Sequence, residues 1–391
     1  MRVLHVIRNL ELSGVQKWVL NLVETPRPTG VTMDVLVLQE PVDEEIADAI
    51  SRAGCRLHTF TRYHSVRNFI WFAWSAKRAG LKYDILHAHV DYLGGVLLWI
   101  AKIMGIPVRL QHAHIILSHP QLGLTLLNWR WWILGLIRSL IATSATGRLA
   151  VSISAGRSIY GADWPKRPGD QVLHPAIPAP ELLSRRDRVE LRSSIGLPQS
   201  AIVVGHVSRL RPVKNQRLLL EVFRAYLDVE PNAWLVVVGD GPDYANLIGH
   251  CRSLGLESRV IWLGHRHDAM TLLQIFDVSL LPSNSESFSL VAAECQAVGV
   301  PIITTTGTPQ GPFRAQTSFY ARLEPDAGLN TWIETIRAAL ALPEDRQRAR
   351  TLFAASDLEI AKNHAQLLSL YALSLDSLSR DAGEGSVKAS R

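Results

Sequence analysis

The sequence predicts an α/β protein made of two doubly wound domains. Its 391 residues are long for one domain and typical of two. Short apolar runs of strand character alternate with helical segments in both halves of the chain, as in parallel α/β sheets. Between the halves, residues 161–197 are rich in Pro, Gly and charge, which is typical of a linker. We therefore expect one domain over residues 1–175, a second over 176–380, and a disordered tail over 381–391, which is rich in small and charged residues.

Composition narrows the classes of partner. Hydrophobic residues make up 47% of the chain, enough for two cores, and the formal net charge is +6. A basic chain favours an anionic partner, such as nucleotide phosphates, acidic lipid or nucleic acid. The three cysteines, Cys55, Cys251 and Cys295, are widely spaced. This spacing is typical of a reducing compartment and argues against a disulfide framework or a zinc site.

Neither the start of the chain nor its apolar stretches predict membrane insertion. Met1 leads directly into a strand-like run, so no signal peptide is evident. The longest apolar stretches, 93–108 and 129–142, are interrupted by Lys102 and Arg138 and fall short of a clean span of about 20 residues. We expect a cytoplasmic protein without a transmembrane helix.

The first half begins with a strand over residues 2–7, a turn at Gly14 and a helix over 17–23, the usual first unit of a doubly wound domain. It lacks the G-x-G-x-x-G pattern, so a dinucleotide fingerprint is not predicted. Further strands are expected at residues 33–38, 83–89, 107–114 and 146–154, with helices at 42–53 and 93–104.

Two histidine pairs fall where predicted strands end: His87 with His89, and His112 with His114. This edge of a parallel sheet is where ligands bind. Four histidines could hold a metal, but no carboxylate cluster accompanies them, and ordinary polar strand ends are the alternative.

The stretch Trp129–Arg138 combines three tryptophans and two arginines with aliphatic residues at helical spacing. Such a mixture is typical of a helix at a membrane interface, and the basic charge of the chain supports that reading. Trp71 and Trp74, followed by Lys77 and Arg78, have a similar character. A tryptophan-rich core helix is the alternative to peripheral membrane contact.

In the second half, a strand over 201–209 ends at Arg209, and Lys214 precedes a helix over 216–227. An arginine fork and a lysine point charge on one strand-to-helix loop can neutralise a diphosphate; unconnected surface cations are the alternative. A strand over 233–238, a turn at 239–242, a helix over 244–254 and a strand over 260–264 follow.

Glu286 and Glu294 lie in the most informative stretch. A buried strand over 277–281 leads into a polar loop with Glu286, and a helix is predicted from Phe288 or Ser289 to Ala297, with Gly299 just past its end. The amino end of a helix after a parallel strand binds phosphate. Glu294 lies about two turns along this helix. Both carboxylates could accept from sugar hydroxyls; a helix cap and a surface ion pair are the alternative.

The E-x7-E spacing of Glu286 and Glu294, followed by the run 297–301, resembles the signature of retaining GT-B glycosyltransferases of family 4, or group 1. Three further segments resemble that family in order and spacing: Ser208-Arg209 with Lys214, the turn 239–242, and Gly264 to Asp268. The resemblance is close between Gly205 and Pro301 and looser before it, and the polysaccharide-biosynthesis members are the most similar.

The resemblance implies a GT-B fold of two Rossmann-like domains facing a cleft, with a nucleoside-diphosphate sugar in the second domain and transfer of its sugar to a hydroxyl with retention. It further implies roles for particular residues. Arg209 and Lys214 would bind the diphosphate, together with the backbone around Phe288, Ser289 and Leu290. Glu286 would bind the sugar, Glu294 would bind the ribose, Gly264 would lie beside the base, and Gly14 would lie on the donor side. His112 or His114 would contact the acceptor hydroxyl, and His112 is favoured.

Some positions depart from the family pattern. Ser208 and Ser287 stand where relatives have Gly, and a serine at 287 costs backbone freedom if that site needs a positive φ. No D-x-D metal-binding motif lies at the end of a predicted strand, and positively charged side chains can replace a metal cation beside a diphosphate. We therefore expect no metal and no other cofactor.

The expected partners are a nucleotide-sugar donor and a glycan or lipid-linked acceptor of cell-surface polysaccharide synthesis, at the inner face of the cytoplasmic membrane, with no nucleic acid. Two other functions fit the same scaffold: a nucleotide-sugar hydrolase or epimerase, and an inactive nucleotide-sugar-binding scaffold protein.

Overall fold

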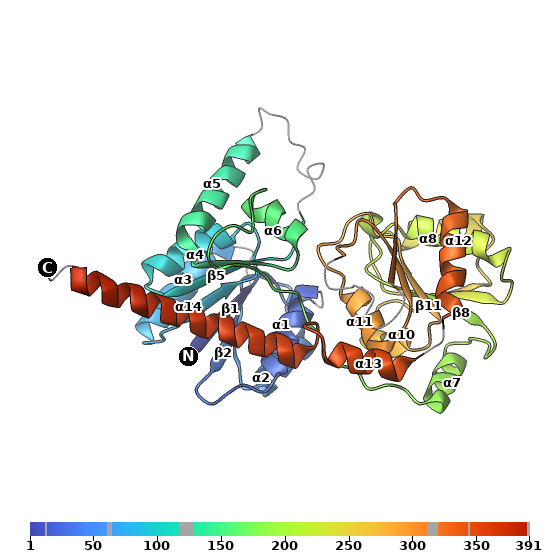
Figure 1. The fold of residues 1–391 in the computed structure, drawn as a ribbon, viewed down its shortest axis with the longest axis horizontal. Coiled ribbons are helices and arrows are strands. Elements are labelled where there is room, and N and C mark those ends of the chain that lie inside the picture. Colours follow the sequence, from blue (N-terminus) through green and yellow to red (C-terminus); the bar gives the residue numbers. More distant parts are fainter. Residues whose placement is uncertain (12–13, 61–64, 117–128, 311–319, 343–344, 389–391) are drawn as a thin grey trace. The chain divides into compact units, whose positions relative to one another are not determined.

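The chain forms two α/β units, each with one parallel sheet and helices around it (Figure 1). The computed structural model describes residues 1–11, 14–60, 65–116, 129–310, 320–342 and 345–388. The first unit contains Met1–Ala176 and Ile360–Arg391, and the second contains Ile177–Glu359.

The sheet of the first unit has the strand order β3-β2-β1-β4-β5-β6-β7, with parallel pairing throughout. Its strands are β1 (Arg2–Ile7), β2 (Thr32–Val37), β3 (Arg56–His58), β4 (Ile85–Ala88), β5 (Val108–Ala113), β6 (Gly147–Ala150) and β7 (Asp170–Val172). The strands run outward from β1 to β3 and then resume with β4 on the other side of β1. The order therefore reverses between β1 and β4, where doubly wound sheets bind ligands.

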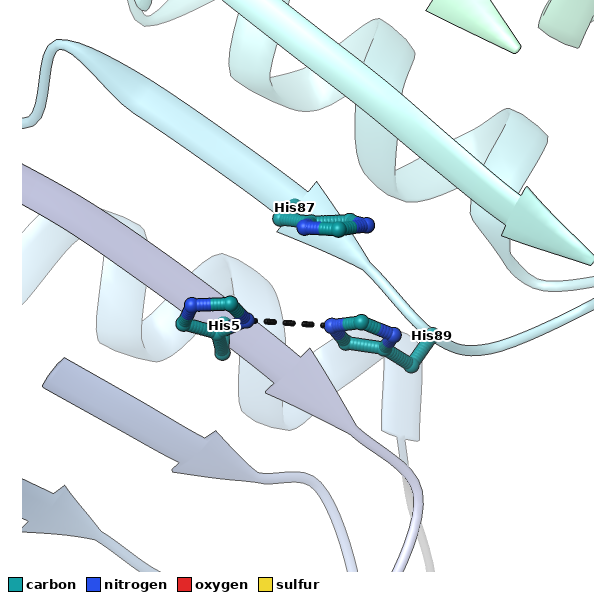
Figure 2. Close-up of side chains that lie close together, drawn as sticks. All are labelled: His5, His87 and His89. Carbon is teal, nitrogen blue, oxygen red and sulfur yellow. Dashed lines mark hydrogen bonds between the residues drawn. The ribbon is translucent and has the colours of Figure 1, made fainter. Parts of the chain in front are cut away.

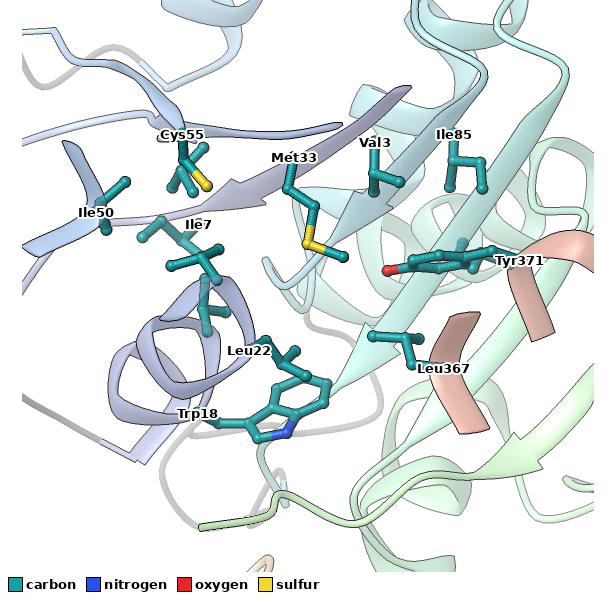
Figure 3. Packing of buried hydrophobic residues seen from close by; sticks show 14 of the residues in the cluster. Val3, Ile7, Trp18, Leu22, Met33, Ile50, Cys55, Ile85, Leu367 and Tyr371 are labelled. Atoms are coloured by element: carbon teal, nitrogen blue, oxygen red, sulfur yellow. The ribbon is translucent and has the colours of Figure 1, made fainter. Parts of the chain in front are cut away.

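Helices cover both faces of this sheet. The core on one face joins the sheet to α1 (Gly14–Glu24), α2 (Glu44–Arg52) and α14 (Ile360–Lys388). The core on the other face joins it to α3 (Ser65–Arg78) and α4 (Gly94–Ile103). α5 (Trp129–Ser144) packs beside α4, and α6 (Ile153–Tyr160) follows β6. In Figure 3, Trp18 and Leu22 of α1 lie near Leu367 and Tyr371 of α14, so the last helix completes the first core.

The second sheet repeats the arrangement in the order β10-β9-β8-β11-β12-β13, and its reversal lies between β8 and β11. Its strands are β8 (Ile202–Val207), β9 (Ala233–Val238), β10 (Val260–Trp262), β11 (Val278–Leu281), β12 (Ile302–Thr305) and β13 (Tyr320–Leu323). The helical elements are α7 (Arg185–Ser194), the 3-10 turn η2 (Pro212–Lys214), α8 (Gln216–Leu227), α9 (Tyr244–Ser253), α10 (Ala269–Leu273), α11 (Leu290–Val298), α12 (Leu329–Leu340) and α13 (Arg346–Ala354). Continuous apolar strands such as Ala233–Val238 fit a sheet that helices cover on both faces.

The doubly wound prediction is confirmed, and the first unit's main segment ends at Ala176, beside the expected boundary at 175. The assignment of residues 360–380 to the second domain is corrected. This segment belongs to the first unit, because Leu367, Leu370 and Tyr371 of α14 pack into the first core. An amphipathic pattern predicts a buried face without specifying which sheet covers it.

Two local predictions also differ. Residues 146–154 were expected to form one strand, but β6 ends at Ala150 and α6 begins at Ile153, after Ser152 caps it by accepting from the Ala155 amide at 3.2 Å. α14 continues to Lys388, where composition predicts a disordered tail from 381. An established helix extends at little cost, since the unfavourable step is its nucleation. Residues 389–391 lie outside the described part.

Within the described residues, none of the helices has the length and apolar character needed to cross a membrane.

Candidate donor site and histidine cluster

The loops after β8 and β11 carry the residues that the motifs single out in the second unit. These strands are neighbours in the sheet and pair in parallel, with Gly205 opposite Ser279, so their carboxyl ends meet at one edge. The β8 loop carries Arg209 and, on η2, Lys214, while the β11 loop carries Glu286. The strand-order reversal therefore gathers cations and a carboxylate at one place.

Lys214 and Glu286 form an ion pair at this edge. The Lys214 ammonium donates to Glu286 Oε1 at 2.6 Å, and the Ser283 hydroxyl donates to the same oxygen at 2.9 Å. The Glu286 side chain is 9% exposed and that of Lys214 is 23% exposed. A carboxylate so little exposed needs charge-assisted partners to offset its desolvation. Lys214 from the β8 loop and Ser283 from the β11 loop therefore fix the negatively charged Oε1 of Glu286 beside the positive charge of Lys214.

Backbone contacts fix the Glu286 loop. The Glu286 amide donates to the Gly307 carbonyl at 2.9 Å, and the Asn284 amide donates to the Val213 carbonyl at 2.8 Å. A Cβ on Gly307 would lie 2.3 Å from the Asn284 carbonyl oxygen, so this close approach requires glycine. The loop is tied both to the segment after β12 and to the η2 turn.

The helix that follows begins as the sequence predicts, within two residues. Ser289 is its N-cap and accepts from the Ala292 amide at 3.2 Å, and Gly299 ends it at φ 74°. The first amides of the helix, those of Leu290 and Val291, precede its internal hydrogen bonding and point toward the loop side, where an anion is favoured. Phe288 is buried. Asn215 is the one non-glycine with positive φ among the described residues, so Ser287 carries no such strain.

Ser208 has a structural function at the end of β8. The His206 ring donates from Nδ1 to the Leu280 carbonyl at 2.7 Å, and its Nε2 lies 2.7 Å from the Ser208 hydroxyl. Burial lowers the pKa of His206 to about 4, so the neutral ring accepts from that hydroxyl. Gln216 donates to Ser208 Oγ at 2.9 Å and to the Arg209 carbonyl at 3.0 Å. This network fixes the backbone of Arg209, whose side chain is exposed.

The other residues predicted to lie on the donor side, Gly264 and Glu294, are found after β10 and on α11. Gly264 follows β10 at φ 63°, and its carbonyl accepts from the Gly239 amide at 2.7 Å, which joins the β9 and β10 loops. Glu294 is buried on α11, at 3% exposure. Arg266 binds Asp268 through two 2.7 Å hydrogen bonds beside Gly264.

The corresponding edge of the first unit holds five buried histidines: His5, His87, His89, His112 and His114. They come from β1, β4, β5 and the residues just after the last two strands. Figure 2 shows His5 reaching from β1 toward His89, with His87 beside them. Trp18 of α1 packs edge-on against His87, His89 and His112, with its ring centre 5.0 Å from that of His112.

One chain of hydrogen bonds runs from Tyr371 on α14 to Leu173, the residue just after β7. His112 Nε2 lies 3.2 Å from the Leu173 carbonyl, which can only accept, so this nitrogen carries the proton. The neutral ring then accepts at Nδ1 from His87 Nε2, at 3.3 Å, and His87 Nδ1 accepts from the Tyr371 hydroxyl at 2.6 Å. A backbone carbonyl and a tyrosine thus set the tautomers of two histidines.

A second chain links His5, His89 and His114 through nitrogen distances of 3.1 and 2.9 Å. Burial lowers the pKa of His5 and His114 to about 3 and places the pKa values of His87, His89 and His112 well below 6.5, with further lowering by neighbouring rings. The cluster is therefore neutral at pH 7.

Among the described residues, two histidine triplets have nitrogens within 4.8 Å of one another: His5, His87 and His89, and His89, His112 and His114. Their closest nitrogens lie at hydrogen-bonding distances, and one chain has a complete tautomer assignment. We interpret the cluster as a hydrogen-bonded network.

The structure separates the two acceptor-side candidates. His112 is fully buried, and both its ring nitrogens face groups inside the first unit. His114 lies past the end of β5 and is 7% exposed, and its amide donates to Asp91 at 3.0 Å. Gly14 is exposed at the start of α1.

Sequence reasoning missed several residues of these sites. Ser283 and Gly307 hold Glu286, while His5, Trp18 and Tyr371 complete the histidine cluster. A serine three residues before Glu286 was visible in the sequence. The contacts of Gly307 and Tyr371 depend on segments distant in the chain and left no local signal.

Comparison with known proteins agrees with this geometry. Residues 187–351, within the second unit, match the family model described as Glycosyl transferases group 1. Over 387 residues the chain is 29% identical to a Bacillus subtilis (strain 168) protein named "Putative glycosyltransferase EpsF", covering 96% of this chain and 97% of that protein. The resemblance inferred from the motifs is confirmed: the second unit carries a group 1 glycosyltransferase domain.

Solved structures establish the fold class. The chain is similar to Anabaena Alr3699/HepE in complex with UDP-glucose, with a TM-score of 0.76, 20% identity and coverage of 96% of this chain and 100% of that one. It is also similar to WaaG, a glycosyltransferase involved in lipopolysaccharide biosynthesis, with a TM-score of 0.65, 16% identity and coverage of 96% and 98%. The fold is GT-B, as predicted.

Proposed function

We propose that this protein is a retaining glycosyltransferase that moves a sugar from a nucleoside-diphosphate sugar to a hydroxyl of a lipid-linked glycan. The observation that carries the proposal is the Lys214–Glu286 ion pair at the strand-order reversal of the second unit, next to the first turn of α11. Cation, carboxylate and helix amides are the three groups that a diphosphate sugar needs at one place.

The donor would lie along the loops after β8, β10 and β11. An ammonium has three donors, so Lys214 can keep Glu286 and also reach a phosphate oxygen, with Arg209 adding a second cation. Glu286 would accept from sugar hydroxyls, Glu294 from the ribose, and Gly264 would lie beside the base. Because a GT-B relative by fold was solved with UDP-glucose, a uridine diphosphate sugar is the first donor to test.

The chemistry we assign to these groups is stabilisation of charge on the departing diphosphate. As the bond between the sugar and the diphosphate breaks, negative charge grows on the phosphate oxygens. Lys214, Arg209 and the amides of Leu290 and Val291 would already face that charge, so they would need little reorganisation. Since these positive groups can act in place of a metal cation, we propose that transfer needs no metal.

On the acceptor side we propose His114 in place of the favoured His112. His112 uses both ring nitrogens inside the first unit, whereas His114 is the more exposed of the two. The lowered pKa of His114 makes it a neutral hydrogen-bonding group rather than a strong base. A His114→Ala variant should therefore lose acceptor turnover while keeping donor binding. A His112→Gln variant that lost turnover selectively, with the His114 variant active, would reverse this assignment.

The test of the donor site is thermal unfolding with a panel of nucleoside diphosphates. Binding to the native state at about a hundredfold above Kd adds about 2.7 kcal/mol, a rise in melting temperature of about 5 °C or more. We expect one base to stabilise the wild-type protein, with or without EDTA, and Lys214→Ala to lose the shift. No shift with any base would contradict the proposal.

Product analysis then separates the competing functions. We expect a glycoside with the donor's anomeric configuration, formed only when acceptor is present. Consumption of the nucleotide-sugar without acceptor would indicate the hydrolase or epimerase. Nucleotide binding without any turnover, across lipid-linked acceptors, would indicate the inactive scaffold.

A further inference from the structure

The outer face of α3 is aromatic and basic. Ile70, Trp71 and Trp74 are 51%, 59% and 55% exposed. Lys77 and Arg78 are exposed on the same side, since positions 70, 71, 74, 77 and 78 follow the three-to-four-residue spacing of one helix face. The opposite face, which includes Phe69 and Phe72, is buried in the core. This helix therefore exposes apolar surface where a covered amphipathic helix is normally polar.

The next two helices along the chain also expose tryptophan. α4 lies next to both α3 and α5. Trp99 on α4 is 48% exposed and Trp132 on α5 is 82% exposed. α4 and α5 pack closely, since a Cβ on Gly95 would lie 2.8 Å from the Ile137 carbonyl oxygen. We call the exposed surface of these three helices the tryptophan face, defined by Trp71, Trp74, Trp99 and Trp132 with Lys77 and Arg78.

The charge on these helices has one sign. The sequences of α3, α4 and α5 contain no Asp or Glu, although the chain contains 35. Arg67 and Lys102 are further exposed cations, and the Arg78 guanidinium lies 4.6 Å from the centre of the Trp74 ring. The tryptophan face therefore combines aromatic groups with uncompensated positive charge.

Arg138 has a different function from the one its sequence context suggests. Its guanidinium donates to the Ser158 and Ile159 carbonyls at 2.9 and 3.1 Å, which ties α5 to α6. The side chains of Trp129, Arg130 and Trp131 lie outside the described part. The surface that carries the argument is thus centred on α3 and α4 as much as on α5.

The second unit provides an internal comparison. Among its described residues, the exposed large hydrophobic side chains are Val189, Val229, Tyr244, Leu329 and Leu342, each on a different element or connection. Isolated exposed hydrophobics are normal, whereas a gathered set indicates an interaction surface. All exposed tryptophans among the described side chains lie on the tryptophan face.

We propose that the tryptophan face docks on an anionic lipid bilayer. Tryptophan prefers the boundary between headgroups and acyl chains, and exposed lysine and arginine are attracted to acidic headgroups. Tryptophan and arginine are also common in protein interfaces, where lysine is depleted; a bilayer is favoured because α3, α4 and α5 offer cations, lysine among them, without any acidic residue, which complements a uniformly anionic surface. This inference concerns where the enzyme works and does not rest on the transfer chemistry, so each can fail alone.

Vesicle flotation of the full chain tests the proposal. The vesicles are phosphatidylcholine alone, or phosphatidylcholine with phosphatidylglycerol, at low and high salt. We expect binding to the anionic vesicles, weakened by salt, and little binding to the neutral ones. Lys77→Glu with Arg78→Glu should lower partitioning by about tenfold or more, since each cation near the surface contributes about 1 kcal/mol. Trp71→Ala with Trp74→Ala should also lower it.

Matched controls come from the second unit. Arg185→Glu with Arg186→Glu reverses two adjacent exposed cations on α7, and Val189→Ala with Val229→Ala removes exposed hydrophobic groups. Both control variants should bind vesicles as the wild type does. Thermal unfolding of each variant without lipid checks that the first unit, which carries the tryptophan face, still folds.

Three results would overturn the proposal: no binding of the wild type to anionic vesicles, equal binding to neutral and anionic vesicles, or tryptophan-face variants that bind as the wild type does. Quenching of wild-type tryptophan fluorescence by brominated lipid in anionic vesicles needs no variant. Its absence would overturn the proposal even if a variant misfolds.

Discussion

The two units have the same strand order around the reversal point and fill that point in opposite ways. On β1, β4 and β5, and just after the last two strands, lie five buried, neutral histidines near Trp18. At the ends of β8 and β11 lie a cation, a carboxylate and the first turn of a helix. In both units the parallel sheet places these side chains at the ends of its strands, and the degree of burial decides whether they are neutral or charged.

Burial acts through the cost of charge. Buried imidazoles stay neutral because desolvation disfavours the charged form, and the ring nitrogens of His87 and His112 then pair with each other, with Tyr371 and with Leu173. Lys214 keeps some exposure and finds Glu286 at 2.6 Å. One edge is therefore suited to packing and tautomer control, and the other to binding a charged ligand.

The largest effect on stability should follow from removing Trp18, which packs against the histidine cluster. Trp18 is fully buried, and its Nε1 donates to Asn363 at 3.0 Å. Trp18→Ala should lower the free energy of unfolding by about 3–5 kcal/mol, measured by denaturant titration. Trp74→Ala, which removes the same side chain from a site that is 55% exposed, should change it by about 0.5 kcal/mol or less. Equal losses in the two variants would contradict the comparison.

The next effect is on catalysis at the charged edge. Lys214→Ala should lower kcat/KM by about 10²–10³, because it removes a preformed positive charge and leaves the Glu286 carboxylate with Ser283. The measurement is initial-rate kinetics with the donor that the thermal screen identifies. Arg224→Ala breaks an exposed ion pair, with Asp228, at the end of α8 in the same unit and is the matched control. If both variants kept wild-type activity, Lys214 would not be part of the site.

The pH dependence of stability separates the two edges further. The folded histidine cluster has pKa values of about 3 for His5 and His114, against about 6.5 in the unfolded chain. Between these values the unfolded chain binds more protons, so stability should fall as the pH drops below about 6.5. Each neutral histidine contributes up to about 1.4 kcal/mol per pH unit.

The test is denaturant unfolding at a series of pH values, with His89→Gln expected to reduce the slope and the exposed His265→Gln to leave it unchanged. An identical slope in the wild type and His89→Gln would show that the cluster does not govern acid stability.

The smallest effect concerns metal. We expect EDTA to change neither transfer activity nor nucleotide-induced stabilisation, because Lys214, Arg209 and helix amides supply the positive groups at the diphosphate. Activity that is lost with EDTA and restored by Mg²⁺ or Mn²⁺ would mean that a cation is needed beside these side chains.

The amino-acid sequence is enough to predict the architecture and to place the charged residues after particular strands. Alternating apolar runs and helices predicted two doubly wound units, because strand and helix periods are local properties of the chain. Ser289 and Gly299 marked the ends of α11 through capping chemistry that acts within a few residues. Arg209, Lys214 and Glu286 could be placed after their strands for the same reason.

Which of these residues meet, and which are buried, depends on the tertiary structure. Lys214 and Glu286 are 72 positions apart, and their contact depends on β8 and β11 being neighbours. His87 and Tyr371 are 284 positions apart, and α14 joins the first unit rather than the second. A histidine at a strand end has the same local pattern whether it binds an acceptor or lies in a core. Desolvation, which depends on the whole unit, distinguishes the neutral histidine edge of the first unit from the charged edge of the second.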